Sequence, residues 1–170
     1  MSYLDVRCAY FASLTFHNRV ACYIFPMLRC KLLQEHATAP SIAHPGEDLG
    51  YDLYSAETVI FPPRGHAIVP TGVAIELTSK NGTPMGALVR DRSSMAARRL
   101  ITTAGVIDAG YRGEIKIVME NLSDAEQTIH RGDKIANLLP YPVLTTAVEV
   151  VDDLTHSKRG AGGFGSSGKR

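Results

Sequence analysis

The chain has 170 residues, a formal net charge of +1 and 45% hydrophobic residues, which suits one domain with a buried core. The nearly balanced charge gives no overall attraction to nucleic acid or to a membrane surface, so any anion must be bound locally. No stretch reaches the roughly 18 apolar residues that would suggest a membrane span. We therefore expect neither nucleic acid nor a membrane as a partner.

The beginning of the chain differs in composition from the rest. Six of the twelve Phe and Tyr residues and all three cysteines (Cys8, Cys22 and Cys30) lie within the first thirty positions. We expect residues 1–26 to be an extension that is poorly ordered or not native. The cysteine spacings match neither a disulfide framework nor a zinc site, so we expect reduced thiols in a cytoplasmic protein.

From Lys31 onward the sequence predicts short strands separated by turns. Runs that are partly alternating and rich in Val and Ile lie at 51–56, 58–61, 66–77, 86–89, 113–120 and 134–143. Turn signals lie at 62–65, 81–82, 109–110 and 131–133. The segment 93–100 instead favours a single short helix with a serine able to cap it. This pattern predicts an all-β sandwich or barrel with one short helix.

Two polar clusters before residue 95 could carry chemistry. Asp52 lies at the start of a predicted strand, where an aspartate is more often a turn former. The cluster at 90–94 places Arg92, Ser93 and Ser94 with a second arginine before the predicted helix. Guanidinium and hydroxyl groups beside free helix N–H groups suit a phosphate, but a surface ion-pair cluster would look the same.

A third cluster runs from Gly105 through Val106 and Ile107 to Asp108, and Tyr111 follows within a glycine-bearing turn. This order places the carboxylate of Asp108 at a firm strand end, which a catalytic base needs. The alternative is a hairpin whose aspartate only stabilises the turn.

Two further clusters lie in the last forty residues. Asn137 is a polar residue inside an apolar strand, where its amide needs hydrogen-bond partners or could hold a water. The glycine-rich end, 158–170, offers backbone N–H groups and Arg159 to a phosphate and Phe164 to a base. An isolated tail of this composition is most often disordered.

In order and spacing, the five clusters resemble the motifs of the trimeric deoxyuridine triphosphatases (dUTPases). The resemblance runs from about Lys31 to Gly168 and is most specific in GVIDAGYRGE (105–114), RGDKIANLL (131–139) and RGAGGFGSSG (159–168). It implies a jelly-roll-like, distorted β-barrel domain (27–157), assembled as a homotrimer, with a C-terminal arm (158–170) exchanged between subunits. It also implies hydrolysis of dUTP to dUMP and pyrophosphate with Mg²⁺ on the triphosphate, which lowers dUTP and supplies dUMP for thymidylate synthesis.

The resemblance also implies a role for each matching residue. Asp108 would accept a proton from the water that attacks the α-phosphorus, and Asn137 would help to place that water. Tyr111 would pack against the deoxyribose, and Asp52 would act on Mg²⁺ through its water shell. The main chain around 104–107 (Gly105, Val106 and Ile107) would read the uracil, and Phe164 would stack on it. The residues implied in phosphate binding are Arg92, Ser93, Ser94, Arg159, Gly165, Ser166 and Ser167.

The chain departs from the family pattern at three places. Asn137 stands where Gln is usual, and Ser167 stands where Thr is common. Ser94 and Met95 replace a more typical Gly-Leu pair, and the doubled serine resembles the related dCTP deaminases.

These departures leave two other functions open. A dCTP deaminase, or a bifunctional dCTP deaminase/dUTP diphosphatase, would need a Glu and an Arg at positions where this chain has Val118 and Ala97. A non-catalytic nucleotide-binding regulator is the candidate from another class, and the presence of Asp108 and the arm argues against it.

Overall fold

The computed structural model describes residues 27–79 and 82–162, and the N-terminal extension expected at 1–26 lies outside them. The described residues form eleven strands and one short helix. The strands are β1 (Met27–Leu32), β2 (Tyr51–Tyr54), β3 (Val59–Phe61), β4 (His66–Pro70), β5 (Val73–Thr78), β6 (Met85–Asp91), β7 (Leu100–Thr102), β8 (Val106–Ile107), β9 (Lys116–Asn121), β10 (Gln127–Ile129) and β11 (Lys134–Pro142), and the helix is α1 (Ser93–Ala97). The prediction of a β-rich fold with one short helix is confirmed.

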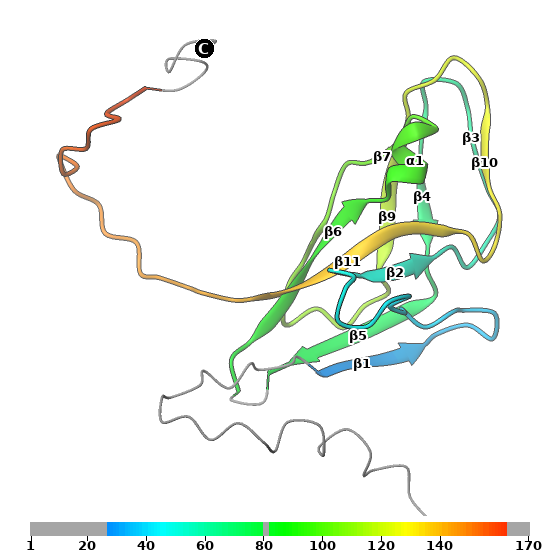
Figure 1. The fold of residues 1–170 in the computed structure, drawn as a ribbon, viewed down its shortest axis with the longest axis horizontal. Coiled ribbons are helices and arrows are strands. Elements are labelled where there is room, and N and C mark those ends of the chain that lie inside the picture. The colour runs from blue at the N-terminus through cyan, green and yellow to red at the C-terminus, as the bar shows by residue number, and fades with distance from the viewer. Residues whose placement is uncertain (1–26, 80–81, 163–170) are drawn as a thin grey trace, which may run out of the picture.

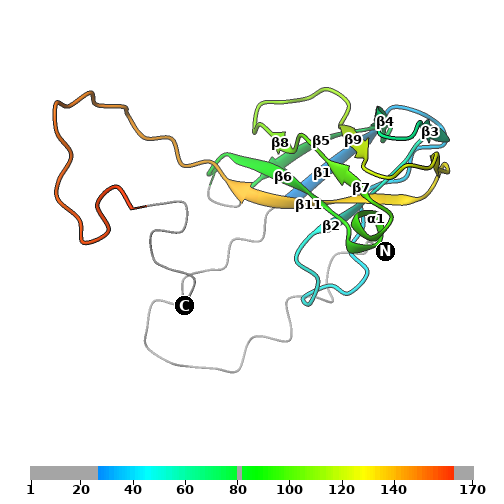
Figure 2. The same cartoon turned by 90° about the horizontal axis from the view of Figure 1, so that it is seen from above.

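Four small sheets surround one core. The largest has the order β2-β11-β6-β8, so the long strand β11 lies between β2 and β6, antiparallel to both (Figure 1). The order β4-β9-β7 forms a second sheet, and the pairs β1-β5 and β3-β10 complete the barrel. Figure 2 shows α1 close to β7, with which it makes contact.

The core explains why these short runs become strands. Strand β9 alternates strictly, with Ile117, Met119 and Asn121 buried and the residues between them more exposed. Its buried apolar side chains join one cluster that includes Phe61, Leu100 and others from every sheet. Where only one face of a sheet is buried, as at β9, a strand needs apolar residues only at alternate positions.

Several elements differ from the sequence-based prediction. The run 66–77 forms two strands because Gly72, with a φ of +66°, turns the chain between β4 and β5. The helix covers only 93–97, and Arg92 is its N-cap without a side-chain hydrogen bond, so the predicted serine cap is wrong. Arg99, with a φ of +63°, ends the helical turn before β7 begins.

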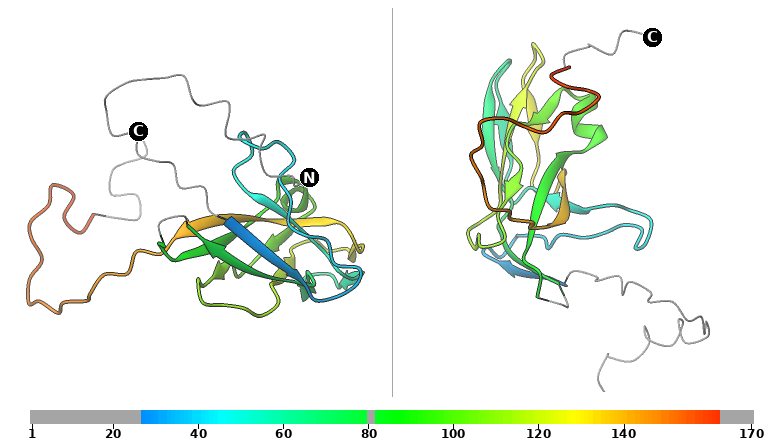
Figure 3. Two further views of the ribbon diagram at one scale, coloured as in Figure 1. Left: turned by 90° about the horizontal axis from the view of Figure 1, so that it is seen from below. Right: turned by 90° about the vertical axis from the view of Figure 1, so that its left-hand side faces the viewer.

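After β11 the chain leaves the barrel. Residues 143–162 extend away from it without forming a strand, as the views in Figure 3 show. Several apolar side chains in this segment are almost fully exposed, with Val148 at 91% and Val150 at 94%. Among the described residues, no helix has the length and apolarity needed to cross a membrane.

Two glycines let the β8 segment approach β6 closely. A Cβ atom on Gly86 would lie 2.7 Å from the carbonyl oxygen of Ile107, and one on Gly105 would lie 2.5 Å from that of Val89. The N–H of Val89 in turn donates to the Gly105 carbonyl at 2.7 Å. The atoms that these added Cβ atoms would meet belong to the backbone, so β6 and the segment around β8 would have to move apart.

We therefore expect Gly86→Ala to lower the free energy of unfolding by about 1–3 kcal/mol, the usual cost of overpacking. Urea unfolding at one fixed protein concentration measures this loss. Gly110→Ala is the matched control, because no atom lies within 4 Å of the position where its Cβ would be added. Equal stability of the two variants would contradict the close approach of β8 to β6.

Candidate active site

A cleft of about 590 Å³ opens beside the centre of the four-stranded sheet. One wall is the loop that precedes β2, and the floor comes from the facing ends of β2, β6 and β11. The residues that line it are Ala43, His44, Asp48, Leu49, Gly50, Asp52, Arg90, Arg92, Ser93, Lys134, Asn137 and Leu139. The sheet thus brings three of the five sequence clusters together.

Strand register explains how the polar residues meet. Asn137 of β11 pairs with Asp52 of β2 on one side and with Arg90 of β6 on the other. Residues directly opposite each other in a sheet project from the same face. The carboxylate of Asp52, the amide of Asn137 and the guanidinium of Arg90 therefore lie side by side on the cleft face. The core face is filled by Leu53, Val89 and Leu138.

Asp52 is the most enclosed charge in the cleft, with only 7% of its surface exposed. Its Oδ1 contacts Nη1 of Arg92, and its Oδ2 lies 2.7 Å from Nζ of Lys134. Nη1 of Arg92 also donates to Oδ1 of Asn137 at 3.5 Å. A buried carboxylate needs such compensation, so the four side chains form one charged network.

The loop before β2 carries a second carboxylate into the cleft. The backbone N–H of His44 donates to Oδ2 of Asp48 at 2.8 Å, and the imidazole Nδ1 lies 3.2 Å from the same oxygen. The backbone hydrogen bond first, and the neighbouring imidazole to a lesser extent, hold the pKa of Asp48 below its usual value. Asp48 therefore stays ionised at neutral pH. The sequence analysis gave it no role.

Asp108 follows β8 directly, as predicted, and hydrogen bonds within the turn hold its shape. Its carbonyl accepts a hydrogen bond from the N–H of Tyr111 at 3.0 Å, and the Tyr111 hydroxyl donates to the carbonyl of Glu114 at 2.9 Å. Arg112 braces the turn by donating to the carbonyl of Ala109 at 2.8 Å. The carboxylate of Asp108 thus projects from a firmly held turn.

A smaller hollow of about 240 Å³ lies along β6 and the segment that leads into β8. Its lining residues are Leu88, Val89, Arg90, Thr102, Thr103, Ala104, Gly105 and Val106. It contains two of the residues predicted to read the uracil, Gly105 and Val106. Arg90 is the only described residue that lines both hollows.

Within one chain, the predicted site residues fall into two separate groups. Asp52, Arg92, Ser93 and Asn137 line the larger cleft, whereas Asp108 does not. The residues predicted to contact the phosphates therefore lie apart from Asp108, the predicted catalytic base.

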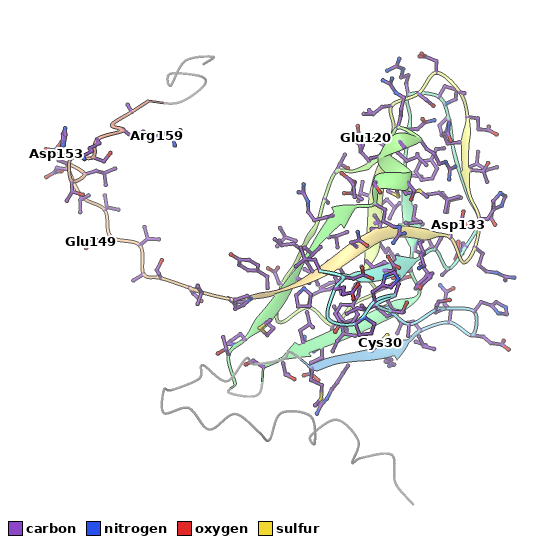
Figure 4. The ribbon with its side chains drawn as sticks, in the orientation of Figure 1. Cys30, Glu120, Asp133, Glu149, Asp153 and Arg159 are labelled. Carbon is purple, nitrogen blue, oxygen red and sulfur yellow. The ribbon has the colours of Figure 1, made fainter. Side chains whose placement is uncertain are left out.

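The remaining predicted residues lie outside the larger cleft. Ser94 is exposed on α1, and Tyr111 is exposed on the turn after β8. Arg159 lies on the segment that leaves the barrel, where its Nε donates to the carbonyl of Gly162 at 2.9 Å (Figure 4). Residues 164–167, with Phe164, Gly165, Ser166 and Ser167, lie outside the described part of the chain.

Besides Asp48, sequence patterns did not single out two other cleft residues, Lys134 and Arg90. Both stood inside recognised clusters, but a lysine and an arginine near a turn have many surface roles. Only the register of β11 with its neighbours shows that they face the cleft.

The fold and the cleft together define a β-barrel protein with a cationic site suited to a phosphate-bearing ligand. A model of the dUTPase family matches residues 35–168. The chain belongs to the dUTPase family.

Curated relatives cover most of the chain. The deoxyuridine 5'-triphosphate nucleotidohydrolase of Clostridium tetani (strain Massachusetts / E88) is 42% identical over 145 residues, which are 84% of this chain and 97% of that protein. The protein of the same name from Solanum lycopersicum is 42% identical over 146 residues, covering 84% of this chain and 82% of the relative.

Solved structures share the fold. The Staphylococcus bacteriophage 80alpha dUTPase with dUPNHPP is 30% identical, with a TM-score of 0.76 over 84% of this chain and 98% of that one. A mutant dUTPase from phage phi11 of S. aureus, described with a structural Mg(II) ion, is 28% identical, with a TM-score of 0.67 over 75% of this chain and 97% of that one.

Proposed function

We propose that this protein hydrolyses dUTP to dUMP and pyrophosphate. The observation that carries the proposal is the cleft, in which Arg90, Arg92 and Lys134 outnumber the carboxylates of Asp48 and Asp52. Such a cleft suits a triphosphate, and it lies in a chain that belongs to the dUTPase family. The activity would lower dUTP and supply dUMP for thymidylate synthesis.

Proton transfer falls to Asp108 in this proposal. Its carboxylate would accept a proton from the water that attacks the α-phosphorus, and the braced turn would keep the carboxylate in place. Tyr111 is held by its own hydroxyl, which donates to the Glu114 carbonyl, so its ring can pack against a deoxyribose. Hydrolysis of this kind depends mainly on positioning and charge stabilisation.

The larger cleft would hold the triphosphate. Arg92 and Ser93 line it directly, and Ser94 would join them on binding. Asn137 would help to place the attacking water through its amide. The main chain of Gly105, Val106 and Ile107 would read the uracil from the smaller hollow. The arm residues Arg159, Phe164, Gly165, Ser166 and Ser167 would close over the nucleotide.

The cleft residues fit a hydrated Mg²⁺ that arrives with the triphosphate. Among the described residues, no three His, Cys, Asp or Glu side chains form a group able to hold a metal ion. Mg²⁺ usually keeps several waters and uses one or two carboxylates together with substrate phosphates. Asp52, with Asp48 nearby, would act through those waters, and the ion would neutralise charge on the triphosphate.

A homotrimer would reunite the two groups of site residues. Within one chain Asp108 stays outside the larger cleft, and the segment 143–162 leads away from the barrel with apolar side chains exposed. Neighbouring subunits would bring the turn of one chain to the cleft of another and accept the arm. We also propose a cytoplasmic location, because the three cysteines show no disulfide or zinc pattern.

The dCTP deaminase alternative finds less support in the structure. The position where it needs a glutamate is Val118 on β9, and the position where it needs an arginine is Ala97 on α1. Glu120 lies on the same face of β9 as Val118 but is two residues further along, opposite His66 of β4.

Release of pyrophosphate from dUTP, dCTP, dTTP and UTP tests the proposal. We expect turnover of dUTP alone, because the Tyr111 ring would pack against the deoxyribose and exclude a 2'-hydroxyl, and the tight hairpin would exclude a thymine methyl. Turnover of dCTP with release of ammonia would instead establish the deaminase. Binding of dUTP without turnover would establish a regulator.

A further inference from the structure

Lys134 lies in the cleft against the rule of strand alternation. In a regular strand, residues 134 and 137 would project from opposite faces, because successive side chains alternate. Both Lys134 and Asn137 nevertheless line the cleft, while Ile135 and Ala136 between them are both fully buried. The beginning of β11 therefore departs from regular strand geometry.

A β-bulge accounts for this placement. Lys134 pairs with Tyr54 and Ala136 with Leu53, so two steps along β11 correspond to one step along β2. A bulge interrupts the hydrogen-bonded ladder and redirects side chains, and bulges are enriched next to active sites. Here the bulge turns Lys134 toward Asp52.

The lysine is fixed by its surroundings. Its Nζ lies 2.7 Å from Oδ2 of Asp52 and 5.9 Å from the centre of the Tyr54 ring. The Tyr54 hydroxyl is itself 2.6 Å from Oγ of Ser41. A lysine that only decorated the surface would not need these contacts.

The guanidinium of Arg92 depends on the same carboxylate. Its Nη1 contacts Oδ1 of Asp52 and donates to Asn137, while its Nε is buried and has no partner in the described part of the chain. The direction of the guanidinium is therefore set through Nη1. If Asp52 rotated, Arg92 would lose its main fixed contact.

We propose that Lys134 is a positioning residue for the reaction, acting through Asp52. By occupying Oδ2, it holds the carboxylate so that Oδ1 fixes Arg92 toward the phosphates. The bulge at the start of β11 serves this contact. The inference rests on the proposed dUTP hydrolysis and adds a residue to which neither the family motifs nor the sequence analysis gave a role.

A double-mutant cycle tests the inference, using Lys134→Met, Asp52→Asn and the double variant in the trimeric full-length protein. We expect Lys134→Met to lower kcat/KM for dUTP about tenfold, in the range seen for residues that orient a site indirectly. The double variant should be no worse than Asp52→Asn alone, because Lys134 then has no carboxylate to hold. Lys134→Arg should restore most of the loss, since it keeps the charge.

Calorimetry with dUPNHPP, in the presence of Mg²⁺, gives a readout that does not depend on turnover. We expect weaker binding by Lys134→Met and unchanged binding by Lys116→Met. The latter is the matched control, since Lys116, the first residue of β9, lies outside the cleft and also pairs with a carboxylate, its Nζ lying 3.5 Å from Oε2 of Glu114.

Additive losses in the cycle would overturn the inference, because they would mean that Lys134 acts on the substrate independently of Asp52. Wild-type values of kcat/KM for Lys134→Met would also overturn it. If Lys134→Met does not assemble, Lys134→Gln, which is neutral and retains a polar end, takes its place in the cycle. A wild-type protein that fails to hydrolyse dUTP would instead count against the proposed function.

Discussion

Asp108→Asn is expected to lower kcat for dUTP about 10²–10⁴-fold, the usual contribution of a general base. The amide cannot accept a proton from the attacking water at neutral pH. It has nearly the shape of the carboxylate, and the turn is held by the backbone carbonyl of residue 108, which the substitution keeps. Affinity for dUPNHPP should therefore stay close to that of the wild type, and single-turnover hydrolysis with parallel calorimetry measures both quantities.

Asp124→Asn provides the matched control for this substitution. Asp124 pairs with Arg64 at 2.7 Å on the exposed surface, and neither residue lines either hollow. The same chemical change there should leave kcat unaltered. A near-normal rate for Asp108→Asn would show that another group accepts the proton.

Part of the fold could be predicted because local rules and tertiary structure agree. The predicted strands at 51–56 and 134–143 form β2 and β11, where apolar residues fill the core face of a half-buried sheet. The turn at 131–133 also forms, with Gly132 at a φ of +88° and the N–H of His130 donating to Asp133. In these segments propensity, pattern and turn chemistry favour the same structure.

Strands β7 and β8 could not be predicted, because their neighbours define them. Strand β8 has two residues and exists through its pairing with Ala87 and Leu88 of β6. Strand β7 has three residues and pairs with β9, while its Thr102 donates two hydrogen bonds to Asp91 at 2.6 and 2.7 Å. Neither segment is long enough to show periodicity, so only the tertiary structure identifies these two strands.

The candidate site, like the fold, could be predicted only in part. Asp52, Arg92 and Asn137 stood in separate clusters. The strand register places Asp52 beside Asn137, and Arg92 contacts both side chains. Lys134 could not be found in this way, since alternation counted back from Asn137 places it on the opposite face. The bulge changes the alternation, and bulges have no reliable sequence signal.

Asn137 has a defined place in this network. Its amide lies between Asp52 and Arg90 in the sheet, and its Oδ1 accepts the hydrogen bond from Arg92. The shorter side chain thus belongs to the group of residues that fix Arg92. Any role in placing a water would fall to its remaining amide donors.

Removal of residues 159–170 is expected to abolish efficient hydrolysis while the proposed trimer stays assembled. Base stacking by Phe164 would contribute about 1–3 kcal/mol, and the loss of Arg159 would remove a charged phosphate contact. Together these losses should reduce kcat/KM for dUTP by at least about a hundredfold, since each 1.4 kcal/mol corresponds to tenfold. Steady-state assays and light scattering measure the two properties on the same sample.

The structure explains why assembly should survive this truncation. The strands of the described chain end at Pro142, and Arg159 lies on the segment that leaves the barrel, so among the described residues the deletion removes no strand and no core residue. Removal of residues 169–170 alone is the control, because these two positions follow the last motif and should not affect turnover. A monomeric truncated protein would show that the arm holds the subunits together, and a fully active one would show that the cleft needs no cover.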